Sequence, residues 1–301
     1  MAKIQVSTGI PNAEAIKQSN QHVLYVEGNG PNSFDHQIIS ELLSDQDISI
    51  DVKPFGPASR IQGAAQALAQ HHPTYYFLID RDHLKDSEIE ECWSNFPNPE
   101  NHNLLVWKKR ELENYFLDIP FLSQSEFYKK PSDELYEKLL RLAQARIYLD
   151  VANMILTEIR EQIKGIDFTR PKPQECTSKD SALIFLRESN FIAQKRDILQ
   201  AYIDNKYLET LFLEKLELLT GGQEPLKVGE GQWVNLMQGK ELLRPLINDN
   251  FRVITTNRTY LQGDERLKTV LKRLVKQVQL DNQPHDFQNL CGLIKKQIAK
   301  K

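Results

Sequence analysis

The sequence predicts an α/β fold: a parallel β-sheet flanked by helices in about the first 120 residues, followed by a mostly α-helical C-terminal half. Three observations predict it. Short apolar runs, typical of buried strands, alternate with segments whose apolar residues recur at the helical period. Acidic residues directly follow two of these runs. After Pro120 the strand-like runs stop and leucine-rich helical patterns take over.

Local patterns predict the first two strands and helices. His22–Val26 is a short apolar run, and Asp35–Leu43 has apolar residues at helical spacing. Ile48–Phe55 alternates apolar and polar residues, as a half-buried strand does. The alanine-rich segment Arg60–His71 follows as a helix, with Ser59 as its expected N-cap.

Two further strands complete the predicted sheet. Thr74–Asp80 is β-branched and aromatic, as buried strands are, and Leu104–Trp107 is another apolar run. Strands that alternate with helices imply a parallel sheet joined by βαβ crossovers.

The rest of the chain is predicted to be helical, with a polar, proline-containing linker at Asp167–Lys179. The expected helices are Ser132 to about Gly165, the pattern over residues 181–219, Gly239–Asn248, Asp264–Leu280 and His285–Lys300. We therefore expect three parts: an α/β domain at residues 1–120, a helical domain at 121–225 and a basic helical segment at 226–301.

Composition excludes several classes of protein. With 301 residues, 40% hydrophobic and 26% charged, the chain is neither disordered nor fibrous. No apolar run is long enough for a membrane helix, and the N-terminal stretch has no apolar core, so we expect neither a membrane span nor a signal peptide. Cys92, Cys176 and Cys291 are too far apart for a disulfide framework or a zinc knuckle, which suits a reducing cytoplasm.

The candidate site consists of acids at strand ends. Glu27 directly follows the first strand, and Asp80 and Asp82 end the third. Residues two apart on a strand point the same way, so Asp80 and Asp82 are expected to project together, with Arg81 opposite. If the first and third strands are neighbours, the three acids meet at the carboxyl edge of the sheet. Converging carboxylates favour a hard divalent cation such as Mg²⁺ or Mn²⁺.

The segments VEGNG and LIDRD resemble the Toprim domain, which has a Glu after the first strand and Asp-x-Asp after the third. The segment WKKRELENYFL resembles the OLD-like Toprim proteins, in particular the stand-alone DUF4435 type. The resemblance implies a catalytic Toprim domain at residues 1–120 with two metal ions. Glu27, Asp80 and Asp82 would hold metal, joined by Glu113, with Glu111 as a weaker candidate.

Other positions fit this resemblance in part. A second acid expected soon after the first Glu is replaced by Pro31, and Asp35 stands as its displaced equivalent or as a helix N-cap. The segment QGKELL resembles a Gly-Lys helix start in the same group, which implies that Lys240 contacts a phosphate or stabilises developing charge; an exposed helix lysine is the alternative. It is not a Walker A motif, because Val234 replaces the required glycine and Glu241 follows the lysine.

The resemblance implies hydrolysis of phosphodiester bonds by two-metal catalysis, in which Glu27 also serves as a candidate general base. DUF4435-type proteins include the nuclease effectors of PARIS-type anti-phage systems, which associate with an ABC-like ATPase sensor. We therefore expect a toxic nuclease with an ATPase partner and a possible homodimer, preferring RNA, with tRNA as a candidate, to DNA. The alternatives are an OLD-type DNA nuclease in repair or recombination and a non-catalytic, regulatory Toprim-fold subunit.

Basic residues suggest where a nucleic acid binds. Two groups are candidates for phosphate contacts, although a solvated loop and an exposed helix face are the alternatives: Lys108, Lys109 and Arg110, and the stripe Lys268, Lys272 and Lys276. No basic patch studded with aromatic residues is visible in the sequence.

The formal net charge of −3 hides a segregation of charge. Residues 251–301 contain 11 Lys+Arg and 4 Asp+Glu, a net of +7, which leaves −10 for the rest of the chain. An acidic catalytic domain joined to a basic tail is therefore expected, with the tail contacting a polymer backbone or an acidic partner.

Overall fold

A computed structural model describes the chain at residues 22–68, 70–82, 84–98, 103–164, 180 and 190–299. The N-terminal stretch, the predicted linker Asp167–Lys179, Cys176 and the predicted helical pattern at 181–189 lie outside the described residues. Cys92 and Cys291 are both free thiols.

The chain divides into two compact units. The first runs to Lys108 and also contains Gln124–Tyr128 and the segment from Phe251 on. The second contains Lys109–Ser123 and Lys129–Asn250. This division differs from the predicted three parts. Residues 226–250 of the predicted basic segment belong to the second unit, and the segment from Phe251 on belongs to the unit that contains the α/β region.

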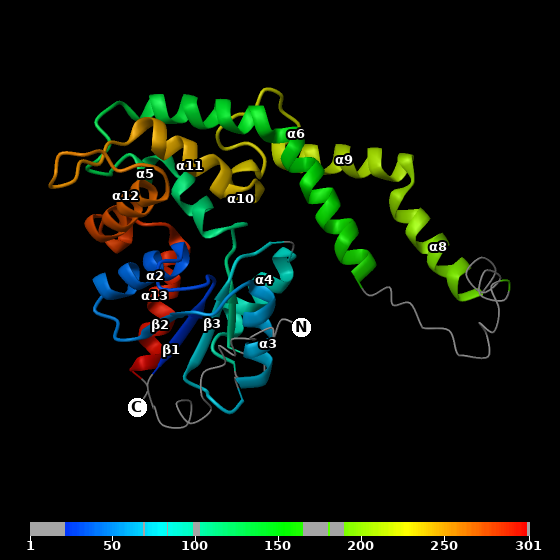
Figure 1. Ribbon diagram of the computed structural model, residues 1–301, viewed down its shortest axis with the longest axis horizontal. Helices are drawn as coiled ribbons and strands as arrows, with labels where there is room; N and C mark the ends of the chain where they lie inside the picture. Colours follow the sequence, from blue (N-terminus) through cyan, green and yellow to red (C-terminus); the bar gives the residue numbers. More distant parts are fainter. Residues whose placement is uncertain are drawn as a thin grey trace, which may run out of the picture. The chain divides into compact units, whose positions relative to one another are not determined.

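A four-stranded parallel sheet forms the centre of the first unit, as predicted (Figure 1). Its strands are β1 (Val23–Val26), β2 (Asp51–Pro54), β3 (Tyr75–Ile79) and β4 (Leu104–Val106), in the order β2-β1-β3-β4. Every residue of β1 and β3 is buried, which explains why these strands read as continuous apolar runs. The connection from β1 leads to β2 on one side of β1, and the connection from β2 leads to β3 on the other side of β1. The direction of the connections therefore reverses between β1 and β3.

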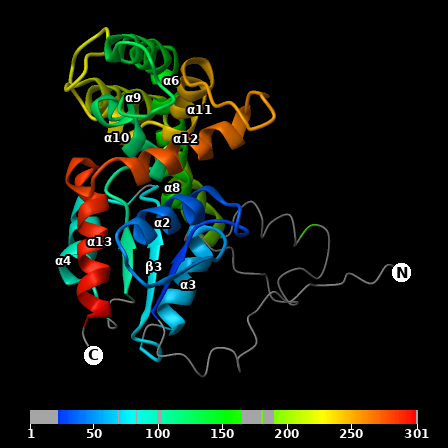
Figure 2. The same ribbon diagram turned by 90° about the vertical axis from the view of Figure 1, so that its left-hand side faces the viewer.

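Helices cover both faces of this sheet (Figure 1, Figure 2). The crossover helices are α2 (Phe34–Asp45), α3 (Ala58–Leu68) and α4 (Asp86–Asn95), followed late in the chain by α12 (Gly263–Gln277), the short 3₁₀ helix η4 (Leu280–Asn282) and α13 (His285–Ile298). α2 and α13 lie on one face and α3 and α4 on the other, as right-handed crossovers to opposite sides of β1 require.

Two features of the crossovers differ from the sequence prediction. Ser59 lies inside α3, so its prediction as the N-cap is wrong; the helix starts earlier because the carbonyl of Pro57 accepts the amides of Arg60 and Ile61, at 2.9 and 3.2 Å. Helix α4 was not predicted at all. It buries only Ile89 and Trp93, too few apolar residues for a periodic signal.

The basic C-terminal segment joins the first unit through helix α12. The predicted apolar face of this helix is confirmed, since Leu267, Val270, Leu271 and Leu274 are all buried. α12 packs against α2, which buries its own apolar stripe at Ile38, Ile39, Leu42 and Leu43. Burial of these two stripes explains why the tail does not form a separate domain.

The second unit is helical. Its elements are the 3₁₀ helix η2 (Leu112–Leu117), α5 (Ile119–Leu122), α6 (Ser132–Lys164), α8 (Asn190–Ile203), α9 (Asn205–Thr220), α10 (Trp233–Leu236) and α11 (Gly239–Asn250). The pattern at 181–219 includes two helices, because Asp204 caps α9 by accepting the amides of Lys206 and Tyr207. Within the described residues, no helix combines the length and the apolar composition that a membrane crossing requires.

Candidate functional site

The acids Glu27 and Asp80 meet at the carboxyl ends of β1 and β3. These strands are neighbours, which is the condition that the sequence prediction needed. Glu27 follows Val26 directly, and its Oε1 accepts the backbone N–H of Asp80 at 2.9 Å. Both residues are partly buried. The reversal of strand order between β1 and β3 places this pair where α/β sheets form their sites.

The glycine after Glu27 is required by the turn that leaves β1. Gly28 has a φ of 126°, and a Cβ there would lie 2.1 Å from Oγ of Ser33. Its amide and carbonyl form a reciprocal pair with Gly56, at 3.1 and 2.8 Å. The Glu-Gly sequence therefore combines a carboxylate at the strand end with a backbone that only glycine adopts without strain.

Asp82 does not project beside Asp80 as predicted. β3 ends at Ile79, so the strand alternation on which that prediction rested stops before either aspartate. Asp82 is exposed in a turn with a φ of 47°. Arg81 holds this turn: its guanidinium donates to the carbonyls of Leu84 and Lys108 and pairs with Asp86 at 2.7 Å.

Asp35 lies in the first turn of α2. The N-cap of this helix is Ser33, so capping by Asp35 is ruled out as the explanation of its position. In the first turn its negative charge is favourable near the helix N-terminus. Its expected role as a metal ligand stays a prediction.

The donor chemistry of this edge fits a hard cation, because the acids at the ends of β1 and β3 offer only oxygen ligands. Their positions do not by themselves make a coordination shell: among the described residues, no three or more His, Cys, Asp or Glu side chains gather into a group that could hold a metal ion. The fit therefore rests on the identity of the ligands and on the position of the pair, and not on a complete ligand set.

In the second unit, the two short segments that carry the OLD-like resemblance come together. Asn114 of η2 donates from Nδ2 to the carbonyls of Val234 and Met237, at 2.7 and 3.0 Å. A Cβ on Gly239 would lie only 2.3 Å from Oδ1 of Asn114, so glycine lets α11 start against η2. Oε2 of Glu111 accepts the amide of Lys240 at 2.9 Å, at the start of α11.

Glu113 and Lys240 form an ion pair in this contact. Nζ of Lys240 lies 3.7 Å from Oε1 of Glu113, whose side chain is 3% exposed, whereas the lysine side chain is 51% exposed. Burial raises the pKa of Glu113 to about 7, and neighbouring Glu111 adds to this, while Lys240 lowers it. The ammonium group of Lys240 therefore lies beside the buried carboxyl group of Glu113. The expected roles of Glu113 as a metal ligand and of Lys240 as a phosphate contact stay predictions.

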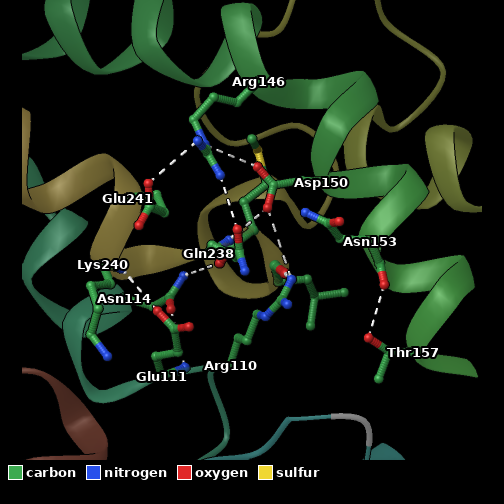
Figure 3. A network of polar contacts seen from close by, with 12 residues as sticks. Arg110, Glu111, Asn114, Arg146, Asp150, Asn153, Thr157, Gln238, Lys240 and Glu241 are labelled. Atoms are coloured by element: carbon green, nitrogen blue, oxygen red, sulfur yellow. Dashed lines mark hydrogen bonds and ion pairs between the residues drawn. The ribbon is translucent and has the colours of Figure 1, made fainter. Parts of the chain in front are cut away.

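A buried carboxylate that the sequence analysis missed anchors the segment before Lys240 (Figure 3). Asp150 of α6 is fully buried; its oxygens accept the amide of Gln238 at 3.2 Å and Nε of Arg146 at 3.3 Å. Arg146 also donates to Oε1 of Gln238 at 2.9 Å. Asp150 lies on the buried face of α6 between Ile147 and Val151, and a charge on an apolar face four residues after an arginine was the available signal.

The predicted phosphate-binding triplet is engaged within the protein. Nη1 of Arg110 donates to the carbonyl of Leu236 at 3.1 Å and lies 4.0 Å from Asp150. Lys109 donates to the carbonyl of Asn114 and lies over the ring of Tyr115, and Lys108 pairs with Glu90 at 2.7 Å. Arg110 therefore has a structural role, and nucleic-acid binding by this triplet stays a prediction.

The lysine stripe of α12 also has partners in its own unit. Lys272 and Lys276 lie 3.8 and 3.4 Å from the carboxylate of Glu41 on α2, and Lys268 donates to the carbonyl of Asn32. These are surface ion pairs, which contribute little stability and can open. Two lysines of the stripe therefore pair with a carboxylate of α2, and contact of the tail with a polymer backbone or an acidic partner stays a prediction.

No protein-family model, curated protein or solved structure matches the chain. The Toprim resemblance therefore rests on the motifs alone.

The buried position of Glu113 predicts a pH-dependent stability. Its folded-state pKa of about 7 exceeds the usual 4.5, so the folded chain binds more protons between these values and its stability falls as pH rises through them. The loss is roughly 3 kcal/mol, complete somewhat above pH 7. Urea unfolding from pH 4.5 to 8 should show that Glu113→Gln lacks this decrease. Exposed Glu209, changed to Gln, is the control, and parallel curves for Glu113→Gln and wild type would contradict the prediction.

Proposed function

We propose that this chain is a divalent-cation-dependent nuclease whose site lies at the carboxyl ends of β1 and β3. The observation that carries the proposal is the hydrogen bond from the Asp80 amide to the Glu27 carboxylate across neighbouring parallel strands. It joins the two acids of the motif at the point where the strand order reverses. Substrates of α/β sheets bind at this edge.

Glu27, Asp80 and Asp82 are the residues that would hold the cation, Mg²⁺ or Mn²⁺. When bound, such a cation supplies Lewis acidity to a phosphodiester oxygen. The chain supplies position: the Asp80 amide fixes the Glu27 carboxylate, and Gly28 turns the backbone away directly after it. Arg81 ties the turn that carries Asp82 to the end of β4 through the carbonyl of Lys108.

The substrate and setting follow from the motif resemblance. We propose a nucleic acid, with RNA and in particular tRNA preferred to DNA, and a toxic effector role in anti-phage defence. An ATPase of the ABC type would be the partner that restrains the effector. The biological test is expression of the gene with and without its neighbouring ATPase gene, in which toxicity should appear only without the partner.

The biochemical test uses the purified full-length chain with total tRNA and with plasmid DNA. With Mg²⁺ or Mn²⁺ we expect cleavage of tRNA, and none after chelation with EDTA. Cleavage of the plasmid alone would assign the chain to the DNA nucleases. Cleavage that persists in EDTA would contradict a cation-dependent site.

A non-catalytic regulatory module is the second candidate. Two observations favour it. The described residues contain no group of three or more side chains that could hold a metal ion, and the Glu27 carboxylate accepts a backbone hydrogen bond from Asp80. This candidate predicts no cleavage of either polymer under any metal, together with no toxicity when the chain is expressed without its partner.

A further inference from the structure

A small hairpin before α12 presents two arginines beside an exposed aromatic ring. It is the orange loop that leads into α12 in Figure 1, and it belongs to the first unit. Ile254 and Tyr260 pair as an isolated antiparallel bridge, and the amide of Leu261 donates to the carbonyl of Val253 at 3.0 Å. Opposed residues of an antiparallel pair have side chains on one face, so Ile254 and Tyr260 lie side by side.

The hairpin is held by its own turn. The amide of Thr255 donates to the carbonyl of Thr259, and the amide of Arg258 donates to that of Thr255, both at 2.9 Å. The two threonine hydroxyls are 2.7 Å apart. Arg258 takes a left-handed conformation with a φ of 60° at the turn. The tip therefore has a defined shape even though its side chains are exposed.

One face of the hairpin packs inward and the other faces solvent. Phe251 and Val253 are buried, at 1% and 5% exposure, whereas Ile254 and Tyr260 are 58% and 54% exposed. Arg252 lies two residues before Ile254 and so shares its face. Arg258 stands at the turn, beyond the Ile254–Tyr260 pair, where strand alternation no longer applies; both arginines are exposed. Asp264 and Glu265 follow in the first turn of α12.

These two arginines differ from the six basic residues that the sequence analysis predicted as phosphate contacts, in the triplet at 108–110 and in the lysine stripe of α12. Each of those six is engaged with a carbonyl or a carboxylate of its own unit. In the part of the chain that the structure describes, neither guanidinium of Arg252 and Arg258 has a hydrogen bond or an ion pair, and the ring of Tyr260 has no ring contact. They are available to a ligand without breaking an internal contact.

We propose that Arg252, Arg258 and Tyr260 form a binding surface for single-stranded nucleic acid, in which an unpaired base stacks on the Tyr260 ring and the two arginines pair with the flanking phosphates. The chemistry favours this occupant: cations separated by an aromatic ring match a polyanion with a base between its phosphates. The segment from residue 251 on has a net charge of +7, which is complementary to such a polymer. This inference deepens the proposed function, on which it rests for the nature of the substrate.

The test measures binding without cleavage. A fluorescein-labelled RNA of about 12 nucleotides is titrated with the full-length chain in EDTA, as a single strand and as the matching duplex, and anisotropy gives Kd. Tyr260→Ala should weaken single-strand binding by roughly 5- to 150-fold, whereas Tyr260→Phe, which keeps the ring, should bind as the wild type does. Arg252→Ala and Arg258→Gly should each reduce the slope of log K against log salt by roughly 0.7.

Matched controls are available in the second unit. Tyr148 is 51% exposed and Arg141 is an exposed arginine of α6, so Tyr148→Ala and Arg141→Ala should leave Kd unchanged. Equal Kd values for wild type and Tyr260→Ala would overturn the proposal, and so would failure of the wild type to bind the RNA. An equal loss for strand and duplex would overturn base stacking. Loss of a copurifying ATPase in Tyr260→Ala, with unchanged RNA binding, would assign the hairpin to a protein partner instead.

The two proposals fail separately. Binding that depends on Tyr260 in a chain that cleaves nothing with Mg²⁺ or Mn²⁺ would support the hairpin and overturn the nuclease. Cleavage in the wild type, with unchanged binding and unchanged cleavage in Tyr260→Ala, would support the nuclease and overturn the hairpin.

Discussion

Glu27→Gln is expected to keep the fold and lose cleavage, by roughly 10²–10⁴-fold, the range for loss of a positioned acid–base group. The reason lies in the bond to Asp80. A glutamine side chain still offers an oxygen to the Asp80 amide, 2.9 Å from the carboxylate in the wild type, but it carries no charge for a cation. Stability and activity should therefore separate in this variant.

Glu27→Ala tests the same site more severely. It leaves the part-buried Asp80 amide without its acceptor, which costs roughly 1–3 kcal/mol of stability in addition to the loss of activity. Asp82→Asn should lower activity with little effect on stability, because asparagine tolerates the left-handed turn at this position.

Asp51→Asn is the matched control for Glu27→Gln. Asp51 is a partly exposed carboxylate at the amino end of β2, paired with Lys53 at 2.9 Å, and thus at the opposite end of the strands. The cleavage activity of Asp51→Asn should equal that of the wild type. Manganese binding, followed by electron paramagnetic resonance, gives a second measurement: affinity should fall in Glu27→Gln and not in Asp51→Asn. Retained cleavage in Glu27→Gln would remove Glu27 from the site.

The sheet was predictable from sequence because its strands are buried on both faces. Continuous apolar runs such as Val23–Val26 and Tyr75–Ile79 leave little ambiguity, and alternation with helices fixes the parallel direction. The position of Glu27 and Asp80 at one edge follows from that topology. The prediction for Asp82 was wrong because it assumed that the strand continued to this residue. β3 ends three residues earlier, and the sequence does not show where the strand ends and the turn begins.

Contacts between distant segments were beyond the reach of sequence patterns. Nothing in the spacing predicts that the side chain of Asn114 contacts the backbone of Val234 and Met237 just before α11. The pairing of Ile254 with Tyr260 is local, but no turn signal in the sequence indicated it. Such contacts depend on how the helices pack and on where a turn closes. Arg110 is an example: its place in a basic triplet predicts a phosphate contact, which stays a prediction, but nothing in the triplet indicates the hydrogen bond that it donates to the carbonyl of Leu236.

Asp150→Ala is expected to give the largest loss of stability, about 3–5 kcal/mol, in urea unfolding of the full chain. Asp150 is fully buried and accepts hydrogen bonds from the Gln238 amide and from Arg146. Without it, the Gln238 amide loses its acceptor, and the guanidinium of Arg146, whose side chain is only 21% exposed, loses its closest carboxylate. Asp150→Asn keeps an acceptor for the amide and should lose less.

A surface pair in the same unit provides the control for Asp150. Asp249 pairs with Lys138 at 2.7 Å but is 51% exposed, so Asp249→Ala should cost less than about 1 kcal/mol. The double variant Asp150→Leu with Arg146→Met removes the closest ion pair of this network and should recover part of the loss, because an uncompensated buried charge costs more than an apolar pair of similar size. Arg110, 4.0 Å from Asp150, and Glu241, 3.6 Å from Arg146, keep their charges in this variant. The double variant Asp150→Ala with Arg146→Ala tests whether the two side chains act together. If its loss of unfolding free energy equalled the sum of the losses in the two single variants, they would not act together. Since Gln238 leads directly into Gly239 and Lys240, the same network determines where α11 begins and so keeps Lys240 beside Glu113.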